Sequence, residues 1–215
     1  MVYADEHLLV LDKPAGLLCV PGRGPDKQDC LSARVQSVYP EALVVHRLDM
    51  ATSGLWLMAR GAEMQRRLSR AFALREVGKR YLAVVAGDPG GPCPPDPWAV
   101  VELPIAADWA HRPLQVIDLE NGKPSRTRWR RAAACAPLER WGPDCTRVEL
   151  EPVTGRSHQL RVHLRALGHP VLGDPWYAPP EVQARAPRLL LHASLLRLDH
   201  PASGQPLSFA SAAPF

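Results

Sequence analysis

The fold of this chain is decided by one stretch of sequence, His46-Arg47-Leu48-Asp49-Met50-Ala51-Thr52-Ser53-Gly54, which runs directly into Leu55-Trp56-Leu57-Met58-Ala59. The second run is strongly apolar and predicts a buried strand. The first run places an obligate cation, Arg47, two positions before a lone carboxylate, Asp49. Polar groups at the mouth of a rigid strand are typical of functional sites, because loops carry chemistry and strands hold it in place.

Asp49 also has an ordinary interpretation. An aspartate in a loop is more often a turn former or a helix cap than a catalyst. Two features favour a functional role here: Arg47 lies close to it in sequence, and no helix is predicted directly after it.

The length and composition indicate an ordinary globular protein. With 215 residues, 46% of them hydrophobic and 22% charged, the chain can bury a substantial core. We expect one domain over residues 1–215, with two lobes that meet at the Pro- and Gly-rich stretch 88–97. No apolar run approaches the ~18 residues of a membrane span. The N-terminus lacks the pattern of an export signal, so a cytoplasmic location is expected.

The five cysteines and the arginines add two weaker indications. The cysteines are scattered, with no Cys-x-x-Cys pair, which argues against a disulfide framework and a zinc knuckle. Of the 26 basic residues, 22 are Arg and four are Lys. Arg binds phosphate bidentately and stacks on bases, which suits nucleic acid. Codon bias of a GC-rich genome explains most of this ratio.

Periodicity predicts strands in successive groups, with few helices between them. Helices are expected at 31–38, 62–74 and 157–167, the second ended by Gly78 and the third capped by Ser157 and followed by Gly168. Strands are expected at 8–11, 55–59, 81–86, 100–102, 115–119, 125–130, 147–151 and 188–198. This order predicts the α+β class with a mixed, mostly antiparallel sheet that helices flank.

A second polar run, Thr154-Gly155-Arg156-Ser157-His158-Gln159-Leu160-Arg161-Val162-His163, stands at the start of the third helix. A helix N-terminus favours anions, so the run could hold a carboxylate ionised or bind phosphate. A solvated helix face is an equally good interpretation. Tyr81, at the start of a strand, is by itself a packing residue.

Three other chemistries are disfavoured. His158 and His163 are five residues apart rather than four, so a metal site is not expected. Ser53 lacks the Gly-x-Ser-x-Gly elbow of serine hydrolases. No Gly-rich phosphate loop or dinucleotide fingerprint is present, and a nucleotide cofactor is not indicated.

Ordered motifs along nearly the whole chain resemble those of the RluA family of pseudouridine synthases. They are Lys13-Pro14-Ala15-Gly16, His46-Arg47-Leu48-Asp49 with Thr52-Ser53-Gly54, Lys79-Arg80-Tyr81-Leu82-Ala83, Gly155 to His163, and Gly168-His169-Pro170 with Leu172-Gly173-Asp174. Three further segments resemble the short, single-domain members, which lack an N-terminal S4 domain: Cys19 to Arg23, Asp108 to Pro113, and Asn121-Gly122-Lys123-Pro124. The stretches 88–97 and 135–144 are less similar.

The resemblance implies a fold and a reaction. The fold is the pseudouridine synthase fold, with an active-site cleft that splits the sheet into two lobes. The reaction isomerises a uridine of RNA, with no cofactor and no metal. The resemblance assigns the catalysis to Asp49, Tyr81 and Arg156, and the filling of the space left by a flipped base to Arg47. His46, Arg161, Arg112 and Lys123 are expected to contact RNA.

The same resemblance implies the partners. Targets are expected in 23S rRNA and in the tRNA anticodon loop, bound by a monomer with no membrane contact. Two alternatives remain open at this point. One is a catalytically idle RNA-binding or ribosome-assembly protein that keeps the fold; the presence of Arg47, Asp49, Tyr81 and Arg156 counts against it. The other, more distant, is a metal-dependent hydrolase.

Overall fold

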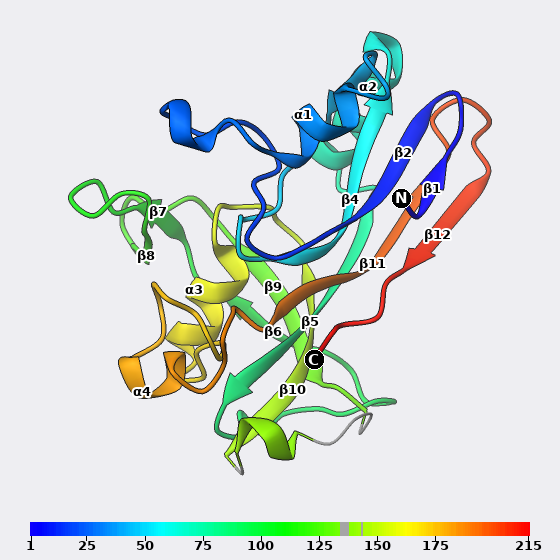
Figure 1. Ribbon diagram of the computed structural model, residues 1–215. Coiled ribbons are helices and arrows are strands. Elements are labelled where there is room, and N and C mark those ends of the chain that lie inside the picture. Colours follow the sequence, from blue (N-terminus) through cyan, green and yellow to red (C-terminus); the bar gives the residue numbers. More distant parts are fainter. Residues whose placement is uncertain (134–137, 143) are drawn as a thin grey trace. The chain divides into compact units, whose positions relative to one another are not determined.

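The computed structural model describes residues 1–133, 138–142 and 144–215 (Figure 1). The strands are β1 (Tyr3–Ala4), β2 (Leu8–Lys13), β3 (Ala42–Val44), β4 (Ser53–Arg60), β5 (Gly78–Ala86), β6 (Ala99–Glu102), β7 (Ile105–Ala107), β8 (Gln115–Ile117), β9 (Arg126–Arg131), β10 (Cys145–Pro152), β11 (Leu191–Asp199) and β12 (Pro206–Ala210). The helices are α1 (Leu31–Gln36), α2 (Ala62–Ala73), α3 (Gln159–Ala166) and α4 (Pro180–Gln183), with short 3₁₀ turns η1 (Pro25–Lys27) and η2 (Glu139–Trp141). Cys135 and part of the stretch 135–144 lie outside the described residues.

The predicted α+β class and mostly antiparallel sheet are confirmed. All eight predicted strands and three predicted helices are present, most within one to three residues of their expected ends. The short strands β1, β3, β7 and β12 were not predicted. None of the helices in the described part of the chain has the length and apolar character that a bilayer span requires.

The chain forms two compact units. Unit 1 comprises Met1–Lys79 with His192–Pro214, and unit 2 comprises Arg80–Leu191 with Phe215. The boundary expected at 88–97 was therefore wrong. That Pro- and Gly-rich stretch is a loop inside unit 2. Pro and Gly mark where regular structure stops, which is not necessarily where one packed core ends.

In unit 1 the central strand is β4. It pairs antiparallel with β2, from Leu8 opposite Ala59 to Lys13 opposite Gly54. At its other edge it pairs with β3 and, in parallel, with β11, while β12 continues the sheet beyond β11. Strands β2 and β4 are buried on both faces, which explains why their sequences are continuously apolar instead of alternating.

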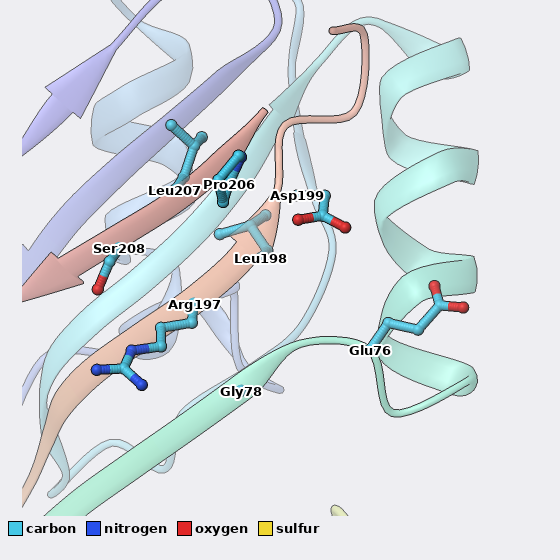
Figure 2. Close-up of a pocket in the computed structure, with 8 residues that line it drawn as sticks. All are labelled: Glu76, Gly78, Arg197, Leu198, Asp199, Pro206, Leu207 and Ser208. Carbon is cyan, nitrogen blue, oxygen red and sulfur yellow. The ribbon is translucent and has the colours of Figure 1, made fainter. Parts of the chain in front are cut away.

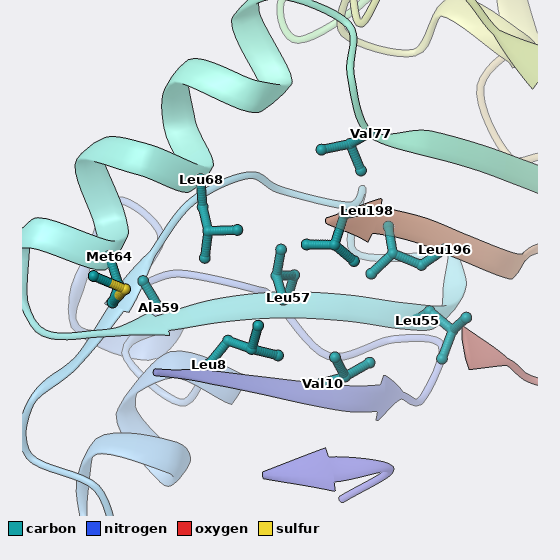
Figure 3. Close-up of a cluster of buried hydrophobic side chains, with 10 residues drawn as sticks. All are labelled: Leu8, Val10, Leu55, Leu57, Ala59, Met64, Leu68, Val77, Leu196 and Leu198. Atoms are coloured by element: carbon teal, nitrogen blue, oxygen red, sulfur yellow. The ribbon is translucent and has the colours of Figure 1, made fainter. Parts of the chain in front are cut away.

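Helix α2 packs its apolar side on this sheet (Figure 3). Met64 and Leu68, one helical turn apart, point to the sheet, Met64 beside Ala59 of β4 and Leu68 toward Leu57 of the same strand. The helix ends within one residue of its predicted end, but Gly78 is not its terminator. Arg75 adopts the left-handed conformation (φ 64°) that usually falls to glycine, and the next N–H closes a Schellman motif on the carbonyl of Ala71 (2.9 Å).

In unit 2 the sheet has the order β5–β10–β9–β6 and is antiparallel throughout. A separate hairpin, β7–β8, pairs Ile105 with Ile117 and Ala107 with Gln115. Helix α3 ends at the predicted Gly168 (φ 84°). Its predicted cap was wrong: the N-cap residue is His158, in the left-handed conformation (φ 53°) and with no side-chain cap bond, so Ser157 does not cap it.

Candidate functional site

Asp49 lies in the loop that joins β3 to β4. The N–H of Thr52 donates to the carbonyl oxygen of Asp49 (3.1 Å) and closes a turn, after which β4 begins at Ser53. Thr52 and Ser53 are buried, Asp49 is half-buried and Arg47 is exposed. Since a strand follows, Asp49 caps no helix. The loop sits at the mouth of the buried strand, as the sequence predicted.

Gly54 explains why the turn stands where it does. Its φ of 108° belongs to the region that L side chains rarely adopt, and a Cβ atom there would overlap the backbone of Ala193. The absence of a side chain lets β4 approach β11 at the parallel contact of Ser53 with His192. The side chains of this pair also meet, through a hydrogen bond between the Ser53 hydroxyl and Nδ1 of His192 (2.9 Å).

A buried lysine holds the Asp49 loop from the opposite side. The side chain of Lys13 is fully buried, and its ammonium group donates to the carbonyl oxygens of Pro14 (2.9 Å), Leu17 (2.7 Å) and Met50 (2.9 Å). A buried charge is costly unless its donors are satisfied, and here three carbonyls accept them. Lys13 thus joins the Lys-Pro-Ala-Gly turn to the residue after Asp49.

His46, which was predicted to contact RNA, anchors the loop in the structure. Its Nε2 accepts the backbone N–H of Leu57 (3.0 Å), its carbonyl accepts Nε1–H of Trp56 (2.8 Å), and its ring stacks on Phe72 at 4.5 Å. Burial lowers the pKa of His46 to about 3, with a smaller contribution from the charge of Lys79. The imidazole is therefore neutral and fastens the loop to β4, and it offers no cation to a phosphate.

Arg47 belongs to the same loop, and Cys19 contacts it. The side chain of Arg47 is exposed and has no hydrogen-bond or ion-pair partner among the described residues. The thiol of Cys19 is buried and accepts the N–H of Leu48 (3.3 Å). Burial is the main cause that raises the pKa of this thiol, so it stays protonated and serves packing.

Tyr81 and Arg156 belong to unit 2. Tyr81 is half-buried on β5, opposite Leu150 of β10. Arg156 is exposed in the loop before α3, where its guanidinium lies 3.4 Å from the carbonyl oxygen of Pro124. Because Asp49 is in unit 1, the ion pair between Asp49 and Arg156 that the family resemblance implies stays a prediction.

The loop that carries Arg156 is shaped by Gln159, which the sequence did not single out. The buried Gln159 amide accepts the N–H of Arg156 (3.0 Å) and the hydroxyl of Thr154 (2.7 Å) through its oxygen. Its nitrogen donates to the carbonyl of Arg126 (2.9 Å) and the hydroxyl of Thr127 (3.0 Å). Both the oxygen and the nitrogen of the amide are thus hydrogen-bonded, and these bonds fix the loop to β9.

Arg161 was wrongly predicted as a phosphate contact. Its side chain is 2% exposed, and the guanidinium forms a bidentate pair with the fully buried Asp174, at 2.8 Å from Nε and 2.6 Å from Nη2. Asp174 Oδ1 also accepts the N–H groups of Trp176 (2.9 Å) and Tyr177 (3.1 Å). The pair shapes the turn after α3. Arg165, on the same helix, is exposed.

The other predicted RNA contacts are exposed side chains of unit 2. Arg112 lies in the loop of the β7–β8 hairpin, and Lys123 in the turn between β8 and β9. Lys123 is placed by its backbone, which exchanges hydrogen bonds with Ile105 (3.0 and 2.8 Å). Both cations can reach a ligand in solution.

Histidines 158 and 163 do not form a metal site. His163 is buried between the Thr127 hydroxyl (2.8 Å) and the Leu103 carbonyl (3.0 Å), and burial lowers its pKa. His158 Nδ1 shares a hydrogen bond of 2.6 Å with the Tyr177 hydroxyl. Within the described ranges, no group of three or more His, Cys, Asp or Glu side chains is arranged to hold a metal ion.

Unit 1 also contains a depression with a volume of about 550 Å³ (Figure 2). It is bounded by β11, β12 and the residues that lead into β5, and its lining consists of Glu76, Gly78, Arg197, Leu198, Asp199, Pro206, Leu207 and Ser208. None of the residues predicted for the functional site lines it, so we assign it no part in catalysis.

Comparison with known proteins identifies the class. The family model described as RNA pseudouridylate synthase matches residues 7–166, and the chain belongs to this family, whose members are isomerases that act on RNA. The chain is 46% identical over 215 residues to the dual-specificity RNA pseudouridine synthase RluA of Escherichia coli K12, covering 100% of this chain and 93% of that protein. The Yersinia pestis protein of the same name is 44% identical over 219 residues, covering 100% and 99%.

A solved structure agrees with this assignment. Human RNA pseudouridylate synthase domain containing 1 superposes with a TM-score of 0.77 and 30% sequence identity, covering 100% of this chain and 83% of that one. The predicted fold and enzyme class are thereby confirmed.

Proposed function

We propose that this RNA pseudouridine synthase is dual-specific, and isomerises uridines both in 23S rRNA and in the tRNA anticodon loop, of the position-32 type. The observation that carries the proposal is the 46% identity, over the full chain, to a relative whose name states dual specificity. The proposal includes a monomer that acts in the cytoplasm, where both RNAs are present.

The proposed chemistry centres on Asp49. Its ionised carboxylate either attacks C1′, forming an ester bond that breaks again when C5 bonds to C1′, or takes a proton from C2′ and later returns it. In both cases the N1–C1′ bond breaks, the uracil rotates, and a C5–C1′ bond forms. The proton on C5 leaves and N1 regains one, so the product is an isomer and no co-reactant is required. The turn at Thr52, the Lys13 clamp and the His46 anchor support this role, because all three hold the loop of Asp49 in place.

Tyr81 and Arg156 complete the proposed machinery. Tyr81 stacks on the isomerising base and assists removal of the C5 proton. Arg156 pairs with Asp49 and favours its ionised form, because a nearby cation lowers the pKa of a carboxyl group. The exposed guanidinium of Arg156, on a loop fixed by Gln159, supports this assignment.

Arg47 takes the place of the target base when the base leaves its stack. Flipping costs a few kcal/mol, which loops and mismatches reduce. A flat, permanently charged guanidinium suits the vacated space. Exposure of Arg47, together with its lack of a partner among the described residues, supports this role. Arg112, Lys123 and Arg165 supply phosphate contacts.

The Asp49→Asn variant tests the chemistry. It should fold as the wild type does, because the change removes a charge but keeps size, and the turn at this position uses the backbone. With RNA tritiated at uridine C5, the wild type should release tritium to water and the variant should release none. Clear tritium release by Asp49→Asn, with an unchanged circular dichroism spectrum, would refute the catalytic assignment.

Dual specificity needs a second experiment. Pseudouridine mapping of rRNA and tRNA from cells with and without the gene should show one uridine lost from each RNA class in the deletion strain. Restoration by the wild-type gene, but not by the Asp49→Asn gene, assigns both to this enzyme. A change in one class only would reduce the proposal to a single-substrate enzyme.

A further inference from the structure

The loop of the β7–β8 hairpin exposes an aromatic ring with a cation stacked on it. Trp109 is 74% exposed, although tryptophan is usually well covered in folded proteins. The guanidinium carbon of Arg112 lies 3.4 Å from the centre of the indole. Because Arg112 covers one face and the residue is still three-quarters exposed, the opposite face of the indole is open to solvent. Arg112 itself has no ion-pair partner in the part of the chain that the structure describes.

This loop is ordered by its own hydrogen bonds. The N–H of Asp108 donates to the carbonyl of Leu114 (3.0 Å), and the N–H of Leu114 donates to the carbonyl of His111 (3.0 Å). The Asp108 carboxylate accepts the backbone N–H of His111 (3.2 Å) and bonds its ring at Nδ1 (3.0 Å). The exposed indole is therefore mounted on a closed, fixed loop.

The base of the hairpin is anchored in unit 2. Ile105 is buried in a cluster with Val162 of α3 and Tyr177. The Tyr177 hydroxyl accepts the backbone N–H of Gln115 (2.9 Å) and shares a second bond with Nδ1 of His158 (2.6 Å). These contacts place the hairpin on the same framework as the loop of Arg156. Little conformational entropy remains to be lost when a ligand meets Trp109.

We propose that the indole of Trp109 is a stacking platform for one unpaired base of the substrate RNA, with Arg112 on its other face. Sequence-specific binding to RNA loops relies on splayed bases stacked on aromatic side chains and on arginine planes. The guanidinium on the far face of the indole adds positive charge close to the stacked base, which favours the negatively charged RNA backbone. The inference rests on the proposed loop substrates and adds a contact to a base other than the isomerised uridine.

Binding measurements with the full-length Asp49→Asn protein test the proposal without turnover. The probe is a tRNA anticodon stem-loop in which 2-aminopurine replaces one loop base at a time; the 23S rRNA stem-loop is tested in parallel. At one loop position, binding should quench the fluorescence. Adding Trp109→Ala should abolish that quenching and raise Kd by roughly 5- to 150-fold. Trp109→Phe should keep most of the quenching and most of the affinity.

Leu119→Ala is the matched control, because Leu119 is equally exposed (76%) in the next turn and has no ring. It should leave Kd within about twofold. An RNA that lacks the base at the quenched position should bind the parent protein and Trp109→Ala equally. Because this test changes the RNA and not the protein, it cannot disturb the folding of the loop. Salt dependence separates the two partners: Arg112→Ala should reduce the slope of log K against log salt by about one, whereas Trp109→Ala should not change it.

The inference is overturned if Trp109→Ala binds both RNAs as tightly as its parent, if no loop position is quenched, or if Leu119→Ala loses as much affinity. The first result would also be expected if the indole served a protein partner. Failure of the proposed function looks different: the wild type would convert no uridine in either RNA while the position-specific quenching persisted.

Discussion

The ammonium group of Lys13 donates a hydrogen bond of 2.9 Å to the carbonyl oxygen of Met50, the residue that follows Asp49. The same oxygen accepts the N–H of Gly16 (2.9 Å). Two donors of the Lys-Pro-Ala-Gly turn thus meet on one carbonyl of the Asp49 loop, and a fully buried cation joins these two distant segments. The contact holds the residue next to Asp49 in place.

Lys13→Met should destabilise the protein by about 2–5 kcal/mol. Methionine fills a similar volume but leaves three buried carbonyl oxygens without their donor, and each lost partner carries a desolvation cost. Urea denaturation measures the free energy of unfolding. The folded variant should also release tritium from labelled RNA more slowly, because the Asp49 loop is loosened. A variant with wild-type stability would show that the clamp contributes little.

Gly54→Ala should cost about 2–5 kcal/mol, from left-handed backbone strain together with the overlap of the new methyl group with Ala193. Gly168→Ala is the matched control, since Gly168 has φ 84° and nothing within 4 Å of an added Cβ. It should cost only the backbone term, about 1–2 kcal/mol. Thermal unfolding of the two variants compares them. Equal losses would mean that the approach of β4 to β11 does not require glycine.

Local patterns predicted the elements better than their partners. The runs that became β2 and β4 are apolar over four or more residues, which is a strong strand signal. The parallel contact of β4 with β11 joins Ser53 to His192, and no local pattern encodes a pairing over that separation. The division of the chain into two units follows such long-range pairings. The local composition of the stretch 88–97 therefore did not indicate where one unit ends.

The candidate site shows the same limit. The strand mouth and the turn at Asp49 were predictable, because both follow from neighbouring residues. The family resemblance named Arg161 as an RNA contact, but no local pattern could supply its partner, Asp174, which comes from the turn after the helix. His46 is likewise explained by a strand and a helix that pack around it, which lower its pKa and remove its charge.

Arg161 and Arg165 should therefore respond differently to substitution. Arg161→Met leaves Asp174 as an unpaired buried charge and should cost about 3–5 kcal/mol of stability, with the salt dependence of RNA binding unchanged. Arg165→Met removes an exposed cation, so stability should hold while the slope of log K against log salt falls by about one. Urea denaturation and binding at several salt concentrations give both quantities. A reduced slope for folded Arg161→Met would restore it as a phosphate contact.

Arg47→Ala should impair flipping of a paired target more than that of an unpaired one. Filling the vacated stack matters most where unstacking costs a few kcal/mol, so kcat/KM should fall by about 10-fold or more on a paired uridine and by less on an unpaired one. Tritium release from matched RNAs measures both. Arg47→Lys keeps the charge but has no planar guanidinium, so its kcat/KM on the paired uridine should lie between the values of wild type and Arg47→Ala. Equal losses on the two RNAs would argue against the wedge.

His46 should make stability depend on pH, in a window that it shares with His163, whose pKa burial also lowers. The pKa of His46 is about 3 in the folded protein against 6.5 as the ordinary value, so the unfolded chain binds a proton below pH 6.5 that the folded protein does not. Stability should then fall with decreasing pH, by at most about 1.4 kcal/mol per pH unit. Asp5, with a folded pKa of about 2 against 3.8, contributes stability that is lost only at lower pH. Urea titrations between about pH 7.5 and 5 cover the range in which both His46 and His163 contribute, so the contribution of His46 is read from the difference between wild type and a His46 variant. His46→Gln, which can still accept the Leu57 N–H, should flatten the slope in this range, and an unchanged slope would place its origin in another group.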